Sequence, residues 1–178
     1  RRVSFIVGYL GEKIRDYVEA TYDFDADYVN QEELKGLGHA ISLTRALGEK
    51  ESRLLIVLGD TVFKADLRAA LGSGESLIGV KEVTDPERFG IIELRGDSIA
   101  GMEEKPAAPK TNLAIVGIYY LTNPPLLYKC LDEIIESGRT TRGEFQLTDA
   151  LQMMLERGHA MKPFLVDGWY DCGEPETL

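Results

Sequence analysis

The pattern of apolar and polar residues divides the chain into short strands and amphipathic helices. Segments 3–7, 25–30 and 54–58 have the apolar content of strands, whereas apolar residues recur at helical spacing in 12–19 and 40–47. Strands that alternate with helices favour a parallel sheet with right-handed crossovers. The first part of the chain therefore predicts a doubly wound α/β fold, with a mostly parallel central sheet flanked by helices.

The pattern changes after residue 83. A short helix over 66–71 and a strand over 76–83 complete the parallel part, and two apolar segments around a Gly-Asp tip then predict a β-hairpin. Further on, we expect strands at 113–121, 161–166 and 169–172 and helices at 124–137 and 146–157. Proline at the first helical positions is typical of a helix start, as at 124–125. The sequence thus predicts one domain, with a parallel half (1–83) and a mixed, antiparallel-leaning half (84–178).

The apolar run 54–58 is the most informative stretch of the sequence. Its unbroken apolar character predicts a parallel strand covered by helices on both faces. Gly59 ends the run and leaves Asp60 at the carboxyl end of the strand, the edge at which open α/β sheets bind ligands. A carboxylate there suits a hard metal ion. Gly-Asp is also common turn chemistry, in which Asp60 would only cap the next helix.

Composition narrows the class of protein. The 178 residues carry a formal net charge of −10, which argues against nucleic-acid binding but not against a single bound nucleotide. Cys130 and Cys172 show no metal-ligand spacing, and we expect both to be buried thiols in a reducing compartment. The sequence shows no signal peptide and no apolar stretch long enough for a membrane span, so we expect a cytoplasmic protein without a membrane partner. Because the chain opens inside a strand without Met, we expect its amino-terminal part to be missing.

Seven motifs occur in an order that resembles a known family. Their residues are Val7-Gly8-Tyr9-Leu10-Gly11-Glu12, Gln31 with Gly36-Leu37-Gly38-His39-Ala40, Leu58-Gly59-Asp60, Asp85-Pro86-Glu87-Arg88-Phe89-Gly90, Glu103-Glu104-Lys105-Pro106, Arg142-Gly143-Glu144-Phe145-Gln146-Leu147-Thr148-Asp149 and Trp169-Tyr170-Asp171-Cys172-Gly173. Each motif alone is weak. Together they resemble the sugar-1-phosphate nucleotidyltransferases, in particular the glucose-1-phosphate thymidylyl- and uridylyltransferases.

The resemblance implies a reaction and its partners. A sugar-1-phosphate would attack the α-phosphorus of dTTP or UTP, with loss of pyrophosphate and formation of a nucleotide-sugar. Such chemistry depends on charge neutralisation and in-line placement, which Mg²⁺ with one or two carboxylate ligands can supply. The partners implied are the triphosphate and the sugar phosphate. Members of the family are commonly oligomers, so the resemblance also makes a homo-oligomer possible.

The resemblance also implies roles for residues at the nucleotide end of the site. Asp60 and Asp171 match the two catalytic metal ligands, and for Asp171 an ordinary turn aspartate is the alternative. Gln31 and Gly36 match the pair that reads a pyrimidine, since an amide can pair with one carbonyl and one N–H. Leu37, Gly59 and Asp60 complete the implied nucleotide contacts, and His39 is expected to support the helix that follows.

The implied sugar-phosphate site draws on both halves of the chain. Its residues are Leu58, Phe89, Gly90, Glu104, Lys105, Ile115, Gly117 and Arg142. Glu104 would accept sugar hydroxyls, whereas Lys105 and Arg142 would face the sugar phosphate. Adjacent residues of a regular strand point to opposite faces, so Glu104 and Lys105 can meet one ligand only if the strand breaks, as Pro106 allows. The alternatives are a solvated ion pair for these two residues and a surface loop for Arg142.

The sequence departs from the family pattern in one respect, and three other kinds of protein are alternatives to this interpretation. The family's amino-terminal Gly-x-Gly-Thr-Arg loop and Pro-Lys-Pro segment are absent, so we expect this chain alone to be inactive and to expose a strand edge where the central strand is missing. A mannose-1-phosphate guanylyltransferase or a cytidylyltransferase is an alternative within the class. A non-catalytic regulatory homologue that binds nucleotide-sugars is another. A metal-dependent glycosyltransferase is disfavoured because Gly59-Asp60-Thr61 lacks an Asp-x-Asp motif.

Overall fold

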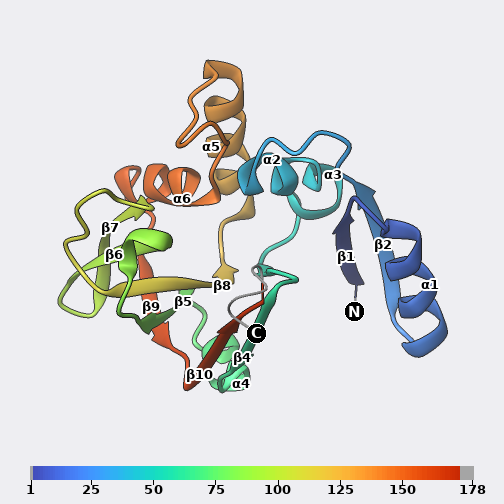
Figure 1. The fold of residues 1–178 in the computed structure, drawn as a ribbon, viewed down its shortest axis with the longest axis horizontal. Coiled ribbons are helices and arrows are strands. Elements are labelled where there is room, and N and C mark those ends of the chain that lie inside the picture. The colour runs from blue at the N-terminus through green and yellow to red at the C-terminus, as the bar shows by residue number, and fades with distance from the viewer. Residues whose placement is uncertain (1, 173–178) are drawn as a thin grey trace.

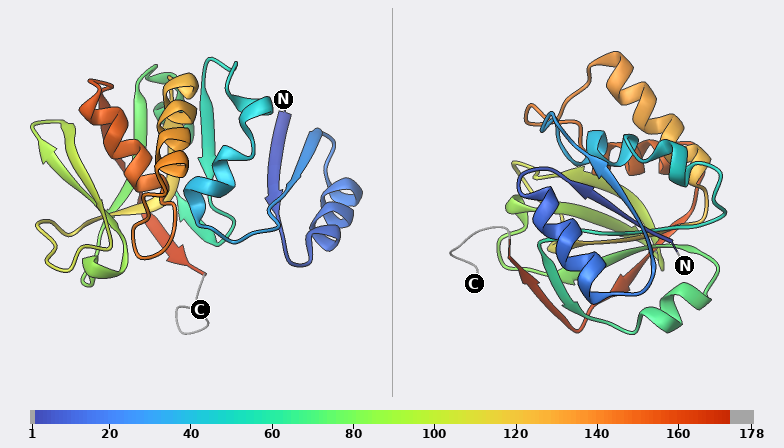
Figure 2. Two further views of the ribbon diagram at one scale, coloured as in Figure 1. Left: turned by 90° about the horizontal axis from the view of Figure 1, so that it is seen from above. Right: turned by 90° about the vertical axis from the view of Figure 1, so that its right-hand side faces the viewer.

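The computed structural model describes residues 2–172, except the side chains of Ala69 and Asp171, and shows an α/β fold (Figure 1). A mixed sheet lies at its centre, helices cover one face, and a strand pair with a short helix covers the other. A smaller unit of two strands and one helix lies at the amino-terminal end, to one side of this sheet (Figure 2).

The central sheet is built around β8 (Leu113–Leu121), which is buried along almost its whole length. One edge of β8 pairs antiparallel with β5 (Ser76–Glu82), which pairs in parallel with β9 (Met161–Leu165). The remaining strands are β3 (Leu54–Val57), β6 (Gly90–Arg95) and β7 (Ser98–Glu104). Both β3 and β6 pair antiparallel with β8, and β7 extends the sheet beyond β6 as the second strand of a hairpin.

The two faces of β8 belong to different cores. Ile115, Tyr119 and Leu121 join a large core with α2 (Leu37–Ser42), α5 (Pro124–Ser137) and α6 (Leu147–Glu156). Val116 and Ile118 instead pack against β4 (Thr61–Lys64), α4 (Leu67–Gly72) and β10 (Gly168–Asp171), which form the opposite layer. Because β8 is covered on both faces, its positions are apolar without alternation.

The amino-terminal unit is a parallel pair of strands with a helix. Strands β1 (Arg2–Val7) and β2 (Asp25–Asn30) pair in register, and α1 (Gly11–Thr21) connects them. Among the residues that the structure describes, β1 pairs only with β2, and β3 pairs only with β8. Both strands therefore have an unpaired edge, in line with the exposed edge that the sequence predicts.

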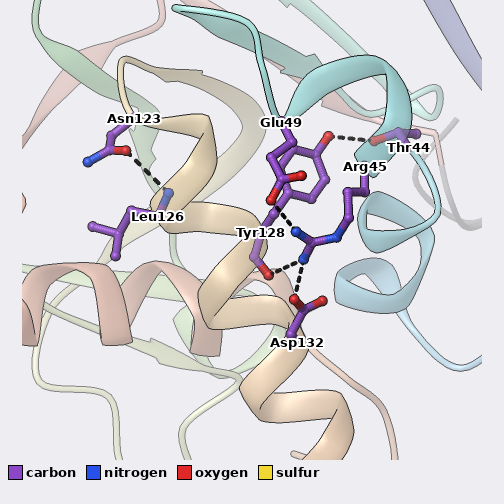
Figure 3. Close-up of polar contacts among 7 residues, drawn as sticks. All are labelled: Thr44, Arg45, Glu49, Asn123, Leu126, Tyr128 and Asp132. Atoms are coloured by element: carbon purple, nitrogen blue, oxygen red, sulfur yellow. Dashed lines mark hydrogen bonds and ion pairs between the residues drawn. The ribbon is translucent and has the colours of Figure 1, made fainter.

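Polar contacts join residues 44–49 to α5 (Figure 3). The guanidinium of Arg45, in α3 (Arg45–Gly48), bonds Glu49, Asp132 and the carbonyl of Tyr128. The hydroxyl of Thr44 lies 2.8 Å from that of Tyr128, and both side chains are buried. At the start of α5, the Asn123 side chain caps the helix by accepting from Leu126 N at 3.2 Å. The contacts of Thr44 and Arg45 hold α3 against α5.

The structure confirms most of the predicted elements. The central sheet, however, was expected to be mostly parallel and is mixed, with β5 and β9 as its one parallel pair among the described strands. Strand 54–58 was expected to be parallel and covered on both faces, but β3 pairs antiparallel with β8 and exposes Leu55 (42%) and Val57 (45%). Alternate residues of a strand point to opposite faces, so Ile56 packs into the core whereas Leu55 and Val57 lie on the uncovered face. The helix expected over 40–47 is split into α2 and α3, because Thr44 bonds back to Ile41 O through both its amide and its hydroxyl.

Two further expectations are corrected. Segment 61–64 was not predicted as a strand, yet β4 pairs antiparallel with β10. Cys130 is buried as expected, but Cys172, which directly follows β10, is half-buried. Within the described part of the chain, no helix has the length and apolar character needed to cross a membrane.

Candidate functional site

A cleft opens where β8 passes from one neighbouring strand to the other. Ala114 pairs with Ile91 of β6, and Ile118 pairs with Val57 of β3, so 115–117 lie between the start of β6 and the end of β3. The cleft at this point has a volume of about 220 Å³. Its walls are formed by Leu37, Leu58, Asp60, Thr61, Arg88, Phe89, Gly90, Glu104, Lys105, Ile115, Val116, Gly117, Tyr119, Gln146, Thr148 and Trp169. Ligands often bind where neighbouring strands diverge in this way.

Gly117 forms the floor of the cleft and has to be glycine. Its φ is +76°, and a Cβ there would lie 2.9 Å from both Leu58 Cδ1 and Thr61 Oγ1. The carbonyl of Gly117 accepts from Leu58 N at 3.0 Å, which fixes the turn after β3 against β8. The absence of a Cβ at this position lets the side chains of Leu58 and Thr61 pack directly against the backbone of β8.

Glu104 is the principal carboxylate on the sheet side of the cleft. The buried hydroxyl of Thr148, in the first turn of α6, donates to Glu104 Oε2 at 2.6 Å. A Cβ on Gly90 would lie 2.8 Å from the same oxygen, so glycine at position 90 makes room for the carboxylate. Burial raises the pKa of Glu104, whereas the Thr148 hydroxyl and the charge of Lys105 act in the opposite direction.

Lys105 follows the last residue of β7 and leaves the strand geometry. Its φ is +44°, in the left-handed region, and its amide donates to Phe89 O at 3.0 Å. Strand alternation is broken at this point, so Glu104 and Lys105 both line the cleft. The difficulty that the sequence poses, two neighbouring residues expected on opposite faces, is thus resolved by the backbone conformation of Lys105.

The β4–β10 pair brings the two candidate metal ligands together along the backbone. Asp171 is the register partner of Thr61, and Cys172 N donates to Asp60 O at 2.8 Å. The carboxylate of Asp60 is exposed and lines the cleft. The side chain of Asp171 lies outside the described part of the structure, as does Gly173 of the same motif.

The donor set at this place fits a magnesium ion better than a softer metal. Hard divalent cations take carboxylate oxygens and keep several waters, so one or two aspartates beside a phosphate ligand suffice. Within the described residues no three His, Cys, Asp or Glu side chains gather into a site of their own.

An aromatic wall closes one side of the cleft. The rings of Phe89 and Trp169 meet edge to face with centroids 5.0 Å apart, and Arg88 lies over Phe89. The indole Nε1 of Trp169 is buried and has no acceptor among the described residues. Buried donors usually have a partner, so this N–H is a polar group that the described residues leave unsatisfied.

The residues expected to contact the nucleotide base lie beside the cleft. Leu37 lines it, whereas Gln31 sits at the end of β2 with its Nε2 3.4 Å from Gly36 O. Gly36 has φ +102°, and a Cβ there would lie 2.7 Å from Phe145 O. Its lack of a side chain is therefore already required by packing against Phe145.

Most of the predicted site residues meet in one place. The cleft is lined by Leu37, Leu58, Asp60, Phe89, Gly90, Glu104, Lys105, Ile115 and Gly117, and it is not lined by Gln31, Gly36, Gly59 or Arg142. The side chain of Asp171 lies outside the described residues. The sequence reasoning missed Thr61, Arg88, Val116, Tyr119, Gln146, Thr148 and Trp169 as lining residues. Arg88, Gln146, Thr148 and Trp169 belong to the motifs that were singled out, so motif membership was the available signal.

The fold is that of an α/β protein with a cleft where the strands of its central sheet diverge. A model of the nucleotidyl transferase family matches residues 4–178, and the chain belongs to that family. The family expected from the order of the motifs is thereby confirmed.

Several relatives and solved structures are similar to this chain. A low-salt glycan biosynthesis nucleotidyltransferase, Agl11 of Haloferax volcanii, is 31% identical over 99% of this chain and 50% of its own length. A glucose-1-phosphate thymidylyltransferase of Streptomyces antibioticus is 32% identical over 86% of this chain and 44% of its own length. A bifunctional GlmU protein of Methanococcus maripaludis is 33% identical over 98% of this chain and 41% of its own length.

Solved structures agree in fold. A UDP-glucose pyrophosphorylase complexed with UDP-glucose has a TM-score of 0.80 and 25% identity, covering 99% of this chain and 77% of its own. A putative glucose-1-phosphate thymidylyltransferase from Bacillus anthracis has the same TM-score and identity, covering 98% of this chain and 72% of its own. The chain spans half or less of the length of the curated relatives named above.

Proposed function

We propose that this chain carries the sugar-phosphate site and part of the nucleotide site of a glucose-1-phosphate nucleotidyltransferase that uses dTTP or UTP. The observation that carries the proposal is the cleft over 115–117, where Asp60 and the pair Glu104–Lys105 line one space. In the proposed reaction, a phosphate oxygen of the sugar phosphate attacks the α-phosphorus of the triphosphate, and pyrophosphate leaves.

The residues of the cleft have complementary parts in this reaction. The ionised Glu104 accepts hydrogen bonds from sugar hydroxyls, and Thr148 keeps its carboxylate oriented. Lys105 neutralises the sugar phosphate and so reduces its repulsion from the triphosphate. Phe89 and Trp169 form an aromatic side of the cleft and exclude water there.

The acidic residues after β3 and in β10 serve a metal ion in this proposal. Asp60 and Asp171 would hold Mg²⁺, which supplies charge neutralisation and alignment of the phosphate oxygens when it is bound. Support comes from the backbone contact between Cys172 and Asp60 and from the register of Asp171 with Thr61. On the other side, Gln31 and Leu37 are proposed to meet the base.

A titration of nucleotide-sugars tests the proposal. UDP-glucose, dTDP-glucose, GDP-mannose and a CDP-linked sugar are each added to the chain with Mg²⁺, and binding is followed by calorimetry. We expect UDP-glucose or dTDP-glucose to bind most tightly, and GDP-mannose preference would instead favour the guanylyltransferase alternative. Absence of binding by all four ligands would contradict the proposal.

The sugar half of the site is tested by comparing UDP-glucose with UDP. Lys105→Met and Glu104→Ala are each expected to lower the affinity for UDP-glucose about tenfold, because each removes a charged hydrogen-bonding partner. The affinity for UDP should change less in Glu104→Ala, since UDP has no sugar hydroxyls at that position. Equal losses for both ligands would show that Glu104 does not contact the sugar.

A further inference from the structure

We propose that Arg142 is a positioning residue that holds Lys105 in the conformation in which it faces the cleft. The guanidinium Nη2 of Arg142 donates to the backbone carbonyl of Lys105 at 2.6 Å. This inference rests on the proposed function, in which Lys105 meets the phosphate of the sugar. It gives Arg142 a different role from a direct contact with that phosphate.

The conformation of Lys105 needs support from its surroundings. Its φ of +44° lies in the left-handed region, which residues with a Cβ rarely occupy. Two hydrogen bonds hold the peptide groups on either side of the residue. Its amide donates to Phe89 O at 3.0 Å, and its carbonyl accepts from Arg142. A charged donor forms the stronger kind of hydrogen bond, so loss of Arg142 removes the firmer of the two restraints.

Arg142 itself is presented by a tightly closed turn. Thr141 and Glu144 exchange two backbone hydrogen bonds, of 2.9 and 3.2 Å, around the pair 142–143. The hydroxyl of Thr141 donates to Asp149 Oδ2 at 2.7 Å, which anchors the turn to α6. Arg142 has a φ of +54°, again in the left-handed region. The turn thus fixes the direction in which the Arg142 side chain leaves the backbone.

The position of Arg142 separates the two possible roles. Arg142 is exposed and does not line the cleft, whereas Lys105 does line it. The observed link between Arg142 and the cleft is therefore its hydrogen bond to Lys105. The same loop is also bonded to the segment 35–38 at the start of α2. Phe145 N donates to Lys35 O at 2.8 Å, and Phe145 O accepts from Gly38 N at 2.7 Å.

Amide hydrogen exchange of the ligand-free chain tests the positioning directly. In Arg142→Met, the Lys105 amide is expected to exchange about tenfold faster, because its left-handed conformation is no longer restrained from the carbonyl side. Arg139→Met is the matched control, since it removes an exposed arginine from the segment that follows α5. An unchanged Lys105 exchange rate in Arg142→Met would overturn the inference, whether or not the chain binds a nucleotide-sugar.

A double-mutant cycle tests whether Arg142 acts through Lys105. The affinity for UDP-glucose with Mg²⁺ is measured for Arg142→Met, Lys105→Met and the double variant. We expect each single variant to bind about tenfold more weakly and the double variant to match Lys105→Met alone. Losses that add in the double variant would show that Arg142 reaches the ligand independently and would overturn the inference. If the wild-type chain binds no nucleotide-sugar, the proposed function fails and the exchange experiment alone decides the role of Arg142.

Discussion

The hydroxyl of Thr148 donates a 2.6 Å hydrogen bond to Glu104 Oε2 and thereby joins α6 to the end of β7. Thr148 is 4% exposed, so its hydroxyl is shielded from solvent. The bond favours the ionised form of a carboxylate whose burial favours the neutral form. Glu104 thus keeps a fixed orientation in the cleft.

Thr148→Val keeps the shape of the side chain and removes the donor. We expect it to weaken UDP-glucose binding about tenfold, since a hydrogen bond to a charged group contributes roughly 1.5–3 kcal/mol. Thr148→Ser retains the hydroxyl and should bind within a fewfold of the wild type. Calorimetric titration measures both, and equal affinities for the Val and Ser variants would contradict this role.

Glu104→Gln is expected to change the pH dependence of stability. Because the pKa of Glu104 is raised by burial, the stability contributed by its neutral form is present at low pH and is lost as the pH rises through that raised value. The Gln variant has no such loss. Its stability relative to the wild type should therefore be greater at about pH 7 than at about pH 4. Denaturant unfolding at the two pH values measures this, with exposed Glu103→Gln as the control. A difference that stays constant with pH would contradict the expectation.

Gly90→Ala should affect the site more than the fold. The new Cβ would lie 2.8 Å from Glu104 Oε2 and 3.1 Å from Thr148 Oγ1, so the carboxylate must move. We expect a destabilisation of about 1–3 kcal/mol and loss of UDP-glucose binding. Gly72→Ala is the control, because no atom lies within 4 Å of a Cβ at that position. Unimpaired binding by Gly90→Ala would show that Glu104 tolerates displacement.

Tyr128→Phe tests the contact between α3 and α5 (Figure 3). The Thr44 hydroxyl donates to Ile41 O at 2.7 Å, so in its 2.8 Å contact with Tyr128 it accepts the phenolic proton. Removal of the phenol should cost about 1 kcal/mol, or roughly 2–4 °C in Tm for a chain of this size. Tyr9→Phe, at a position 92% exposed, should leave Tm unchanged. Equal Tm values for the two variants would contradict the role of this bond.

Elements with a strong local signal could be predicted from the sequence. The strand at 113–121 is a long run of β-branched and aromatic residues, and α5 begins at Pro124 as its two prolines indicate. The glycines and charged residues of the cleft were found through the order of the motifs. Thr148 and Trp169 were not predicted as site residues. The role of Thr148 depends on its hydrogen bond to the distant Glu104, and that of Trp169 depends on the burial of its indole.

Features that depend on strand pairing could not be predicted in the same way. β4 covers four residues with no apolar run, and it forms because β10 pairs with it. The direction of β3 is set by β8, which lies more than fifty residues later in the sequence. The left-handed conformation of Lys105 likewise depends on hydrogen bonds with Phe89 and Arg142. None of these partners is visible in a local pattern.

The most direct test of the proposed site is the effect of Mg²⁺ on nucleotide-sugar binding, followed by the fluorescence of Trp169, the only tryptophan of the chain. We expect Mg²⁺ to strengthen UDP-glucose or dTDP-glucose binding at least about tenfold in the wild type and in Asp23→Asn, an exposed control, but not in Asp60→Asn. The same Mg²⁺ effect in Asp60→Asn as in the wild type would contradict a metal site at the end of β3.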